Sequence, residues 1–262
     1  MSDEPNAEQV GAVDPTVAIE RPEGTGPVVL ACEHASNAMP AEYRWLGLDP
    51  QARVAHIAWD PGALGVARIL SERLDAPLVH QRASRLLYDC NRPPQAESAM
   101  PAVSEVYSIP GNAGLDEAER ARRVTRFYEP WRRTLAGVLG ERRARLAPTA
   151  LVTIHTFTPV YRGVPRTVEI GVLHDADTRL ADALLAACAA AGGYDTRRNE
   201  PYGPQDGVTH TLVEHALPLG LPNVMIEVRN DLVGDAAGEA AIGAWLGDRL
   251  EEALAALGMG AR

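Results

Sequence analysis

The sequence contains no lysine, so its positive charge rests on arginine alone. The 25 basic residues stand against 35 aspartates and glutamates, which gives a formal net charge of −10 over 262 residues. An acidic chain without a basic block repels nucleic acid and anionic membranes, so we expect neither as a partner. An anionic substrate would have to be held by a local group of arginines, against the overall charge.

Cysteine is also scarce. Cys32, Cys90 and Cys188 are odd in number, scattered and without CxxC spacing, which excludes a disulfide framework and a thiolate zinc site. We expect them to be small buried apolar side chains in a reducing cytoplasm. No apolar run approaches the length of a membrane span, and the N-terminus has no signal-peptide pattern. These observations favour a cytoplasmic protein.

Motifs of several catalytic classes are absent. The chain has no GxSxG nucleophile elbow, no GxxxxGK[ST] phosphate loop, no GxGxxG after a strand and no HExxH. Aromatic residues make up 5% of the chain and apolar residues 46%, so aliphatic side chains and alanine must fill the core. Residues 1–24 are rich in Asp, Glu, Pro and Gly, which predicts a disordered or loosely attached arm. We expect residues 25–262 to form a single domain.

Apolar patterning predicts alternating strands and helices. Short apolar runs typical of buried strands cover residues 27–32, 54–59, 77–80, 149–155, 167–173 and 222–228. Apolar residues at helical spacing predict helices over residues 62–74, 116–146 (divided or kinked at Pro130), 178–191 and 237–257. The composition of residues 91–114 predicts a long loop. This alternation predicts an α/β fold with a mainly parallel or mixed sheet flanked by helices on both faces.

Polar residues follow four of these apolar runs. His34, Asp60, His155 and Glu227 each stand at or just beyond the end of a predicted strand. Ligands of open α/β sheets bind at the carboxyl ends of the strands, so these side chains are expected at one edge. A catalytic zinc takes three protein ligands, often two histidines and a carboxylate, and a second carboxylate can then act as general base.

The same stretches carry a family resemblance. The motifs are Cys32-Glu33-His34-Ala35-Ser36-Asn37, Asp89-Cys90-Asn91-Arg92, His155-Thr156-Phe157-Thr158-Pro159, Asn199-Glu200-Pro201-Tyr202 and Glu227-Val228-Arg229-Asn230-Asp231. From about Val28 to Leu250 the chain resembles the N-formylglutamate amidohydrolase family, which is similar in fold to the zinc carboxypeptidases and aspartoacylase. The resemblance implies one zinc ion and a water molecule that attacks an amide carbonyl.

The resemblance also implies roles for individual residues. His34 and His155 match the two histidine ligands, Glu227 matches the general base, and Asn91-Arg92 resembles the pair that holds a substrate carboxylate. Carboxypeptidases place a glutamate ligand three residues after the first histidine, where this chain has Asn37.

The third metal ligand therefore remains open. We expect Asp60, because a neighbouring strand should bring it to the same edge. Glu33 and Asn37 are the alternatives. Glu33 adjoins His34 and would point to the opposite face of a continuing strand.

Further polar residues are candidates for the pocket. Arg92 is a candidate catalytic residue that stabilises the oxyanion or binds the substrate carboxylate. Loop and strand-end positions make six more residues candidates for substrate binding: Arg85, Arg162, Arg166, Tyr202, His210 and Arg229.

The sequence thus predicts a zinc-dependent amidohydrolase. The expected substrate is a small N-acyl amino acid, with N-formyl-L-glutamate hydrolysed to formate and glutamate as the leading candidate. The alternatives are a related amidase for another acyl amino acid, a peptide or a cell-wall fragment, and a non-catalytic binding protein on the same fold. The sequence does not give the oligomeric state.

Overall fold

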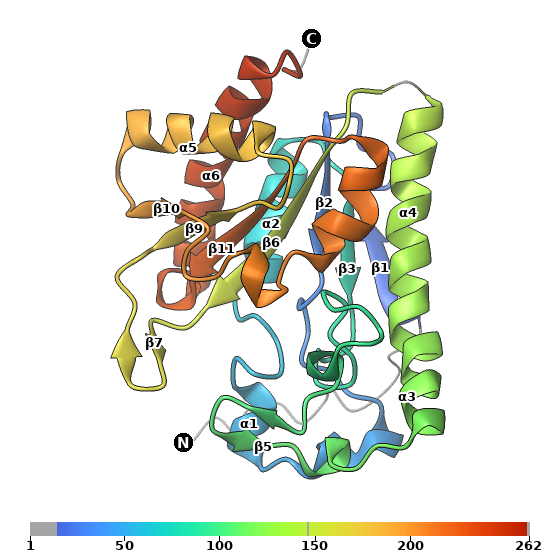
Figure 1. The fold of residues 1–262 in the computed structure, drawn as a ribbon. Coiled ribbons are helices and arrows are strands. Elements are labelled where there is room, and N and C mark those ends of the chain that lie inside the picture. Colours follow the sequence, from blue (N-terminus) through green and yellow to red (C-terminus); the bar gives the residue numbers. More distant parts are fainter. Residues whose placement is uncertain (1–14, 146, 261–262) are drawn as a thin grey trace.

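A seven-stranded mixed sheet organises the chain in the computed structural model, which describes residues 15–145 and 147–260. The strand order is β1 (Val17–Glu20), β3 (Leu78–Gln81), β2 (Val28–Cys32), β6 (Ala150–Phe157), β11 (Asn223–Arg229), β9 (Ile170–Leu173) and β10 (Thr196–Arg198). Strands β3, β2, β6 and β11 run parallel, while β1 and β9 are antiparallel to their neighbours β3 and β11. The carboxyl ends of β2, β6 and β11 therefore meet at one edge, towards the bottom of Figure 1.

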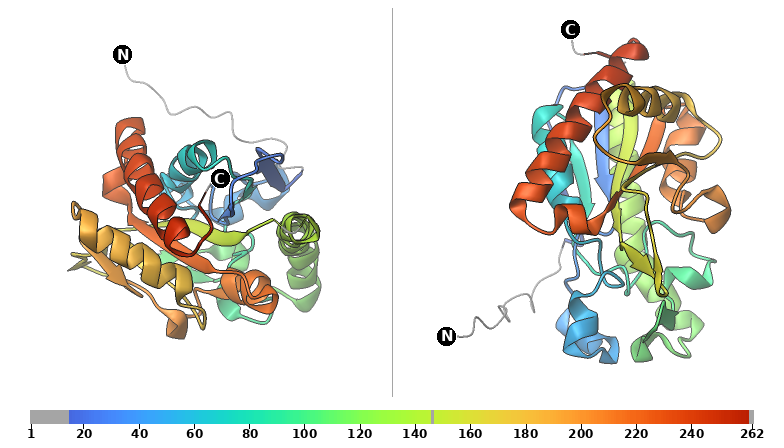
Figure 2. Two further views of the ribbon diagram at one scale, coloured as in Figure 1. Left: turned by 90° about the horizontal axis from the view of Figure 1, so that it is seen from above. Right: turned by 90° about the vertical axis from the view of Figure 1, so that its left-hand side faces the viewer.

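Helices cover both faces of this sheet (Figure 2). They are α1 (Pro50–Val54), α2 (Ala63–Arg73), α3 (Glu117–Arg123), α4 (Glu129–Ala144), α5 (Arg179–Ala191) and α6 (Ala236–Ala256). Two π-helical turns span Val124–Tyr128 and Leu212–Ala216, and short 3₁₀ turns span Ala41–Gly47, Glu97–Ala99, Pro110–Asn112, Pro204–Asp206, Leu217–Leu219 and Asn230–Val233. Within the described residues no helix combines the length and the apolar character that a membrane span requires.

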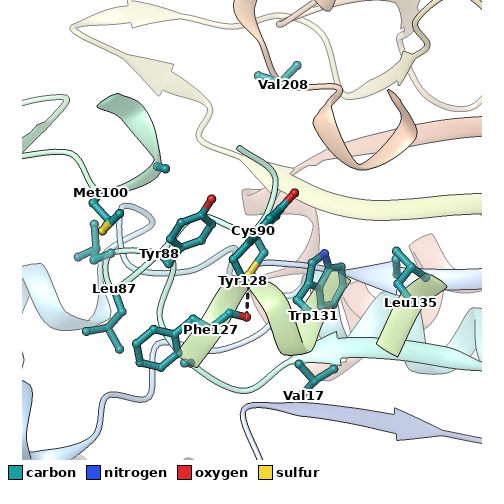
Figure 3. Packing of buried hydrophobic residues seen from close by; sticks show 14 of the residues in the cluster. Val17, Leu87, Tyr88, Cys90, Met100, Phe127, Tyr128, Trp131, Leu135 and Val208 are labelled. Carbon is teal, nitrogen blue, oxygen red and sulfur yellow. Dashed lines mark hydrogen bonds between the residues drawn. The ribbon is translucent and has the colours of Figure 1, made fainter. Parts of the chain in front are cut away.

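Strand side chains alternate between two cores. In β2, Val29 and Ala31 belong to the cluster that includes Trp131 of α4, whereas Leu30 belongs to the cluster with Leu70 of α2. Both faces of the strand are buried, as expected for a parallel strand between two helical layers. The α4 cluster concentrates most of the aromatic residues of the core, as Figure 3 shows, and its cysteine, like the two others, is buried and free. The predicted α/β fold with helices on both faces is confirmed.

Two expected features at the N-terminal side are wrong. The arm predicted over residues 1–24 contains β1, which pairs with β3 from Val17 to Glu20; residues 1–14 lie outside the described part of the chain. The strand predicted over residues 54–59 is absent. Val54 is the last residue of α1, whose start is fixed by Pro50 in the first turn and by the Asp49 side chain, which accepts a hydrogen bond from the Ala52 amide at 2.9 Å. Residues 55–59 form a turn after this helix and no strand.

Several loops carry short hairpins. The predicted loop 91–114 contains β4 (Val103–Ser104) paired with β5 (Tyr107–Ser108), and β7 (Val160–Tyr161) pairs with β8 (Val164–Pro165) after β6. Both hairpins lie beyond the carboxyl edge of the sheet (Figure 1). The two hairpins are linked, because the Arg162 amide donates to Glu105 Oε1 at 3.2 Å.

Candidate metal and active site

The carboxyl edge brings together three buried side chains from separate segments. His34 follows β2, His155 lies near the end of β6, and Asp60 lies in the loop before α2. The Asp60 amide donates to the His34 carbonyl oxygen at 2.9 Å, so this loop is fixed to the end of β2. Asp60 thus reaches the predicted edge, although the strand expected to carry it there does not form.

Three ligand atoms of these residues face a common point. Nδ1 of His34 lies 3.1 Å from Oδ2 of Asp60, Nδ1 of His155 lies 3.0 Å from the same oxygen, and the two nitrogens are 3.2 Å apart. Ligand atoms at the usual zinc distances of about 2.0–2.1 Å in a tetrahedral site lie about 3.3 Å from one another. The three atoms therefore fit three corners of a zinc site, and they form the one such group in the described part of the chain.

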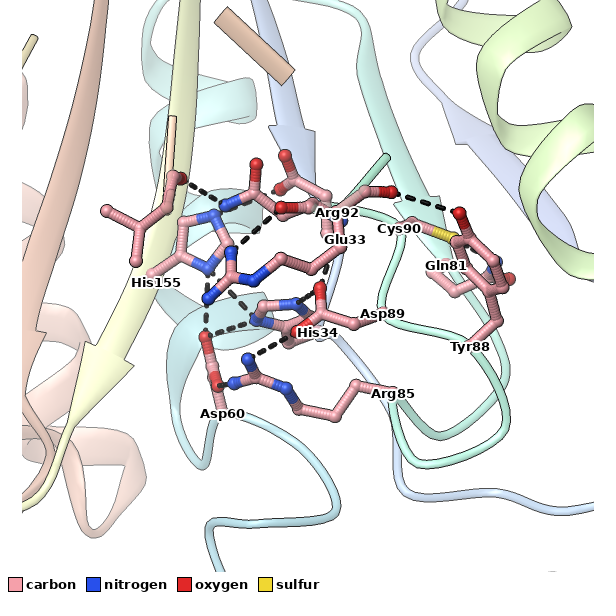
Figure 4. Close-up of polar contacts among 12 residues, drawn as sticks. Glu33, His34, Asp60, Gln81, Arg85, Tyr88, Asp89, Cys90, Arg92 and His155 are labelled. Carbon is pink, nitrogen blue, oxygen red and sulfur yellow. Dashed lines mark hydrogen bonds and ion pairs between the residues drawn. The ribbon is translucent and has the colours of Figure 1, made fainter. Parts of the chain in front are cut away.

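The far side of each histidine ring is also held. Nε2 of His34 contacts Oδ1 of Asp89 at 2.7 Å, and Nε2 of His155 lies 3.1 Å from Oε2 of Glu33 (Figure 4). The second contact has ion-pair distance without hydrogen-bond alignment. Carboxylates behind metal-binding histidines fix the ring orientation and leave the other nitrogen for the metal. Glu33, one alternative third ligand, thus takes the role of orienting His155.

The other alternative ligand is also placed elsewhere. Asn37 donates from its side-chain nitrogen to the Arg53 carbonyl oxygen at 3.0 Å and is not part of the group. The position that holds the metal-binding glutamate in carboxypeptidases therefore takes part in local backbone packing. The carboxylate of the group that could hold a metal ion comes from Asp60.

Electrostatics favour a cation at this point. Glu33, Asp60, Asp89 and Glu227 are all buried, and Arg85 is the one arginine that forms ion pairs with any of them in the described residues. Burial by itself lowers the pKa of a histidine, but the carboxylates of Glu33 and Asp60 raise the pKa of His155 well above its usual range. A bound divalent cation would compensate the same negative charge.

Glu227 lies beside this group. It is the cross-strand partner of His155 in the parallel pair of β11 and β6, and it is 6% exposed. Its Oε2 atom has no hydrogen-bond partner among the described residues. Burial raises the pKa of Glu227 to about 7. A carboxyl group that is unpaired and has a pKa near neutrality is suited to accept and return a proton.

A cavity of about 390 Å³ opens onto these residues. Nine of the twelve predicted site residues line it: His34, Asp60, Arg85, Asn91, Arg92, His155, Arg162, Tyr202 and Glu227. Its lining also includes the apolar side chains of Ile57, Leu86 and Val103. Most of the residues singled out in the sequence therefore line one cavity.

Two of the cavity residues have side chains already engaged. Asn91 anchors the segment opposite, because its side chain donates to the Val208 carbonyl oxygen and accepts from the Thr211 amide at 3.0 Å. Arg85 forms ion pairs with Asp60 and Asp89. Contact of Asn91 and Arg85 with substrate stays a prediction. The contacts observed for both side chains are with other residues of the protein.

Three predicted substrate-binding residues do not line the cavity. The Arg166 guanidinium lies 4.6 Å from the Tyr161 ring centre and 4.8 Å from that of Tyr202, so it supports the wall from behind. Nε2 of His210 contacts the Tyr128 hydroxyl at 2.8 Å. Arg229 donates to Asp231 at 2.8 Å and to the Thr167 carbonyl oxygen at 3.2 Å. Substrate contact by these three stays a prediction that the cavity lining does not support.

Three ionisable residues of the cavity lining are not among the predicted site residues: Asp89, His56 and Glu105. Asp89 belongs to the Asp89-Cys90-Asn91-Arg92 motif, so its position in that motif was the available signal. His56 and Glu105 line the cavity mouth and form an ion pair at 2.7 Å. No pattern in the sequence indicates that pair, because its members come from the end of α1 and the turn of a distant hairpin.

Two solved structures are similar to this chain over most of its length. A gene product of Agrobacterium tumefaciens has a solved structure with a TM-score of 0.91 and 53% sequence identity, over 93% of this chain and 96% of that one. An N-formylglutamate amidohydrolase from Ralstonia eutropha has a TM-score of 0.59 at 18% identity, over 90% of this chain and 95% of that one, and so supports the fold alone. No protein of curated function matches the chain significantly.

The family assignment rests on a separate match. The family model described as N-formylglutamate amidohydrolase matches residues 26–233, which include every predicted site residue. The resemblance stated from the sequence motifs is thereby confirmed. The chain belongs to the N-formylglutamate amidohydrolase family.

Proposed function

We propose that this protein is a zinc-dependent hydrolase that cleaves the amide bond of a small N-acyl amino acid. N-formyl-L-glutamate, hydrolysed to formate and glutamate, is the leading candidate substrate. The observation that carries the proposal is the triangle of ligand atoms from His34, Asp60 and His155, with separations of 3.0–3.2 Å, next to the unpaired carboxyl of Glu227. Family membership supports the amide-hydrolysing activity.

His34, His155 and Asp60 would hold the zinc ion. When bound, zinc polarises a carbonyl group and lowers the pKa of a coordinated water molecule towards about 7. Glu227 accepts the proton of the attacking water and then passes it to the leaving nitrogen as the C–N bond breaks. The acyl group leaves as a carboxylate and the amino acid leaves as a free amine.

Arginines of the cavity would bind the anionic part of the substrate. Arg92 and Arg162 line the cavity and form no ion pair within the described residues. The Arg92 guanidinium donates to the Asn91 carbonyl oxygen at 2.8 Å through one nitrogen, which leaves its other donors available. A planar guanidinium binds a carboxylate through two parallel hydrogen bonds, so these two residues are the best candidates for carboxylate binding.

The test combines metal content with activity on a single preparation. Protein purified without added metal would be assayed for zinc and then incubated with N-formyl, N-acetyl and longer N-acyl derivatives of glutamate, aspartate, leucine and glycine, together with short acylated peptides and a muramyl peptide. We expect stoichiometric zinc and release of a free amine from N-formyl-L-glutamate. Hydrolysis of another member of the panel alone would identify the related-amidase alternative.

The non-catalytic alternative is also decided by this experiment. Its supporting feature in the sequence was Asn37, and the group of residues that could hold a metal ion does not include that residue. Absence of both zinc and turnover on every substrate, in protein that unfolds cooperatively, would refute the proposed function.

A further inference from the structure

Arg85 makes two contacts that suit the metal site better than a substrate. One terminal nitrogen of its guanidinium lies 3.1 Å from Oδ1 of Asp60, and the other lies 2.6 Å from Oδ2 of Asp89 (Figure 4). The Arg85 side chain is 25% exposed, but the side chains of Asp60 and Asp89 are only 3% and 5% exposed, so both contacts end on buried carboxylates. Both ends of the guanidinium fork are therefore occupied.

The two carboxylates that Arg85 holds both act on the metal ligands. Asp60 points its other oxygen, Oδ2, at the Nδ1 atoms of both histidines. Asp89 points its other oxygen, Oδ1, at Nε2 of His34, on the far side of that ring. Arg85, Asp60, His34 and Asp89 thus form a closed ring of contacts in which each carboxylate uses one oxygen for Arg85 and one for the site.

Charge alone does not explain an arginine at this place. A guanidinium near a divalent cation repels it, so the electrostatic effect of Arg85 by itself would weaken metal binding. Its geometric effect has the opposite sign. The Asn91 amide also donates to Oδ1 of Asp89 at 3.0 Å, so Arg85 is one of two groups that hold this carboxylate. Without Arg85, Oδ1 of Asp60 would be a second free oxygen and Oδ2 of Asp89 would lose its arginine partner, so the ligands would lose part of their fixed arrangement.

We propose that Arg85 is a positioning residue that fixes Asp60 and Asp89 and thereby increases the metal affinity of the His34–Asp60–His155 site. This inference rests on the zinc site of the proposed function. It gives Arg85 a role other than the expected substrate binding, which stays a prediction. It also predicts that replacement of Arg85 weakens metal binding. If Arg85 acted through its charge alone, the same replacement would strengthen metal binding.

The experiment measures zinc dissociation constants at one fixed pH by competition with a chromogenic chelator. The proteins are the wild type, Arg85→Gln, Arg85→Lys and the matched control Arg92→Gln. The control removes a guanidinium group from the same cavity, but Arg92 forms no ion pair with Asp60 or Asp89. We expect both Arg85 variants to bind zinc roughly 10–100-fold more weakly, the usual effect of losing such a supporting contact. Arg92→Gln should bind zinc as tightly as the wild type or more tightly.

Each result has one interpretation. Zinc binding by Arg85→Gln that equals or exceeds that of the wild type would overturn the inference, and so would unchanged binding by Arg85→Lys, which keeps the charge but cannot span two carboxylates. If Arg85→Gln fails to fold, judged by thermal unfolding without zinc, the Arg85→Lys result decides. A wild-type protein that binds no zinc would overturn the inference and the proposed function together, whereas tight binding by every variant would overturn the inference alone.

Discussion

Glu227 is buried, and its carboxyl group forms no ion pair with any of the described residues. Arg229, two residues further along β11, contacts Asp231 and Glu169, and Oε2 of Glu227 has no partner among the described residues. Its carboxyl group is close to His155 in the sheet yet is not one of the three atoms of the ligand triangle. The proposed base and one proposed ligand therefore occupy neighbouring positions on adjacent strands.

This separation of roles gives the first prediction. Glu227→Gln removes the proton acceptor but keeps the size and polarity of the side chain, so we expect zinc content and unfolding temperature to stay near the wild-type values. Turnover should fall by roughly 10²–10⁴-fold, the usual contribution of general acid–base catalysis. Zinc content and turnover are measured on one preparation. Loss of zinc would make Glu227 a ligand, and near-normal turnover would remove it from the mechanism.

The second prediction concerns the third ligand. Asp60→Asn replaces a carboxylate with a neutral amide, a much weaker ligand, and should lose most of the zinc affinity. Asn37→Ala is the control, because Asn37 contacts only the Arg53 carbonyl oxygen by its side-chain amide and should leave zinc affinity unchanged. Chelator competition measures both. An equal loss in the two variants would point to a general effect on folding and contradict the assignment of Asp60.

At the scale of elements, the loop between His34 and α2 decides where Asp60 lies. Gly62 ends this loop with φ at 82°, in the left-handed region, and precedes the first turn of α2. A Cβ atom at this position would lie 2.5 Å from a methyl group of Val233 and 2.6 Å from the Val233 carbonyl oxygen. Both the backbone conformation and the contact with the segment after β11 require glycine here.

The third prediction uses Gly62 with a matched control. Gly62→Ala combines left-handed strain with overpacking against backbone and should destabilise the protein by roughly 2–5 kcal/mol. Gly163→Ala has a similar φ of 80° but no atom within 4 Å of its Cβ, so it should cost only about 1–2 kcal/mol. Denaturant unfolding of both zinc-free variants measures the difference. Equal losses would show that the contact with Val233 does not constrain the loop.

The elements themselves were predictable to different degrees. Residues 149–155 and 222–228 were expected as strands and form β6 and β11 with nearly the same bounds, because continuous apolar runs encode strands that are buried on both faces. The short edge strand β10 was missed, since its sequence, Thr-Arg-Arg, is polar and its pairing with β9 supplies the only reason for an extended conformation. Pro130 was expected to divide the helix after residue 116; it lies in the first turn of α4, directly after a π-helical turn.

For the whole molecule, metal binding and stability should be coupled. The site gathers four buried carboxylates in a chain whose formal net charge is already −10, so a divalent cation relieves repulsion in the folded state only. At a free zinc concentration of 100 times Kd, binding to the folded state alone adds about 2.7 kcal/mol, which corresponds to about 5–11 °C in Tm for a chain of this size.

The fourth prediction follows from this coupling. Addition of zinc to metal-free protein should raise Tm by that amount, and a chelator should reverse the shift. His34→Ala should abolish the response, while Glu227→Gln, which leaves the ligand triangle intact, should keep it. Scanning calorimetry with and without zinc measures all three proteins. A shift of the same size in His34→Ala would mean that zinc binds elsewhere.

The sequence by itself determined the α/β class, the central strands and the presence of His34, His155 and Glu227 at strand ends. These features follow from local apolar patterning, and the parallel arrangement of β2, β6 and β11 then brings their ends together. The family motifs supplied the zinc hypothesis and the amide-hydrolysing activity from the same residues.

Only the tertiary structure decided which other charged residues serve the site. Asp89, Glu33 and Arg85 contact the ligand side chains from behind, whereas Arg229 lies outside the cavity lining. No local pattern distinguishes these residues, because an arginine in a loop has the same sequence signature whether it faces a carboxylate or solvent. Their partners are set by the order of strands in the sheet and by the paths of the loops, which bring residues 25 or more positions apart to within about 3 Å of each other.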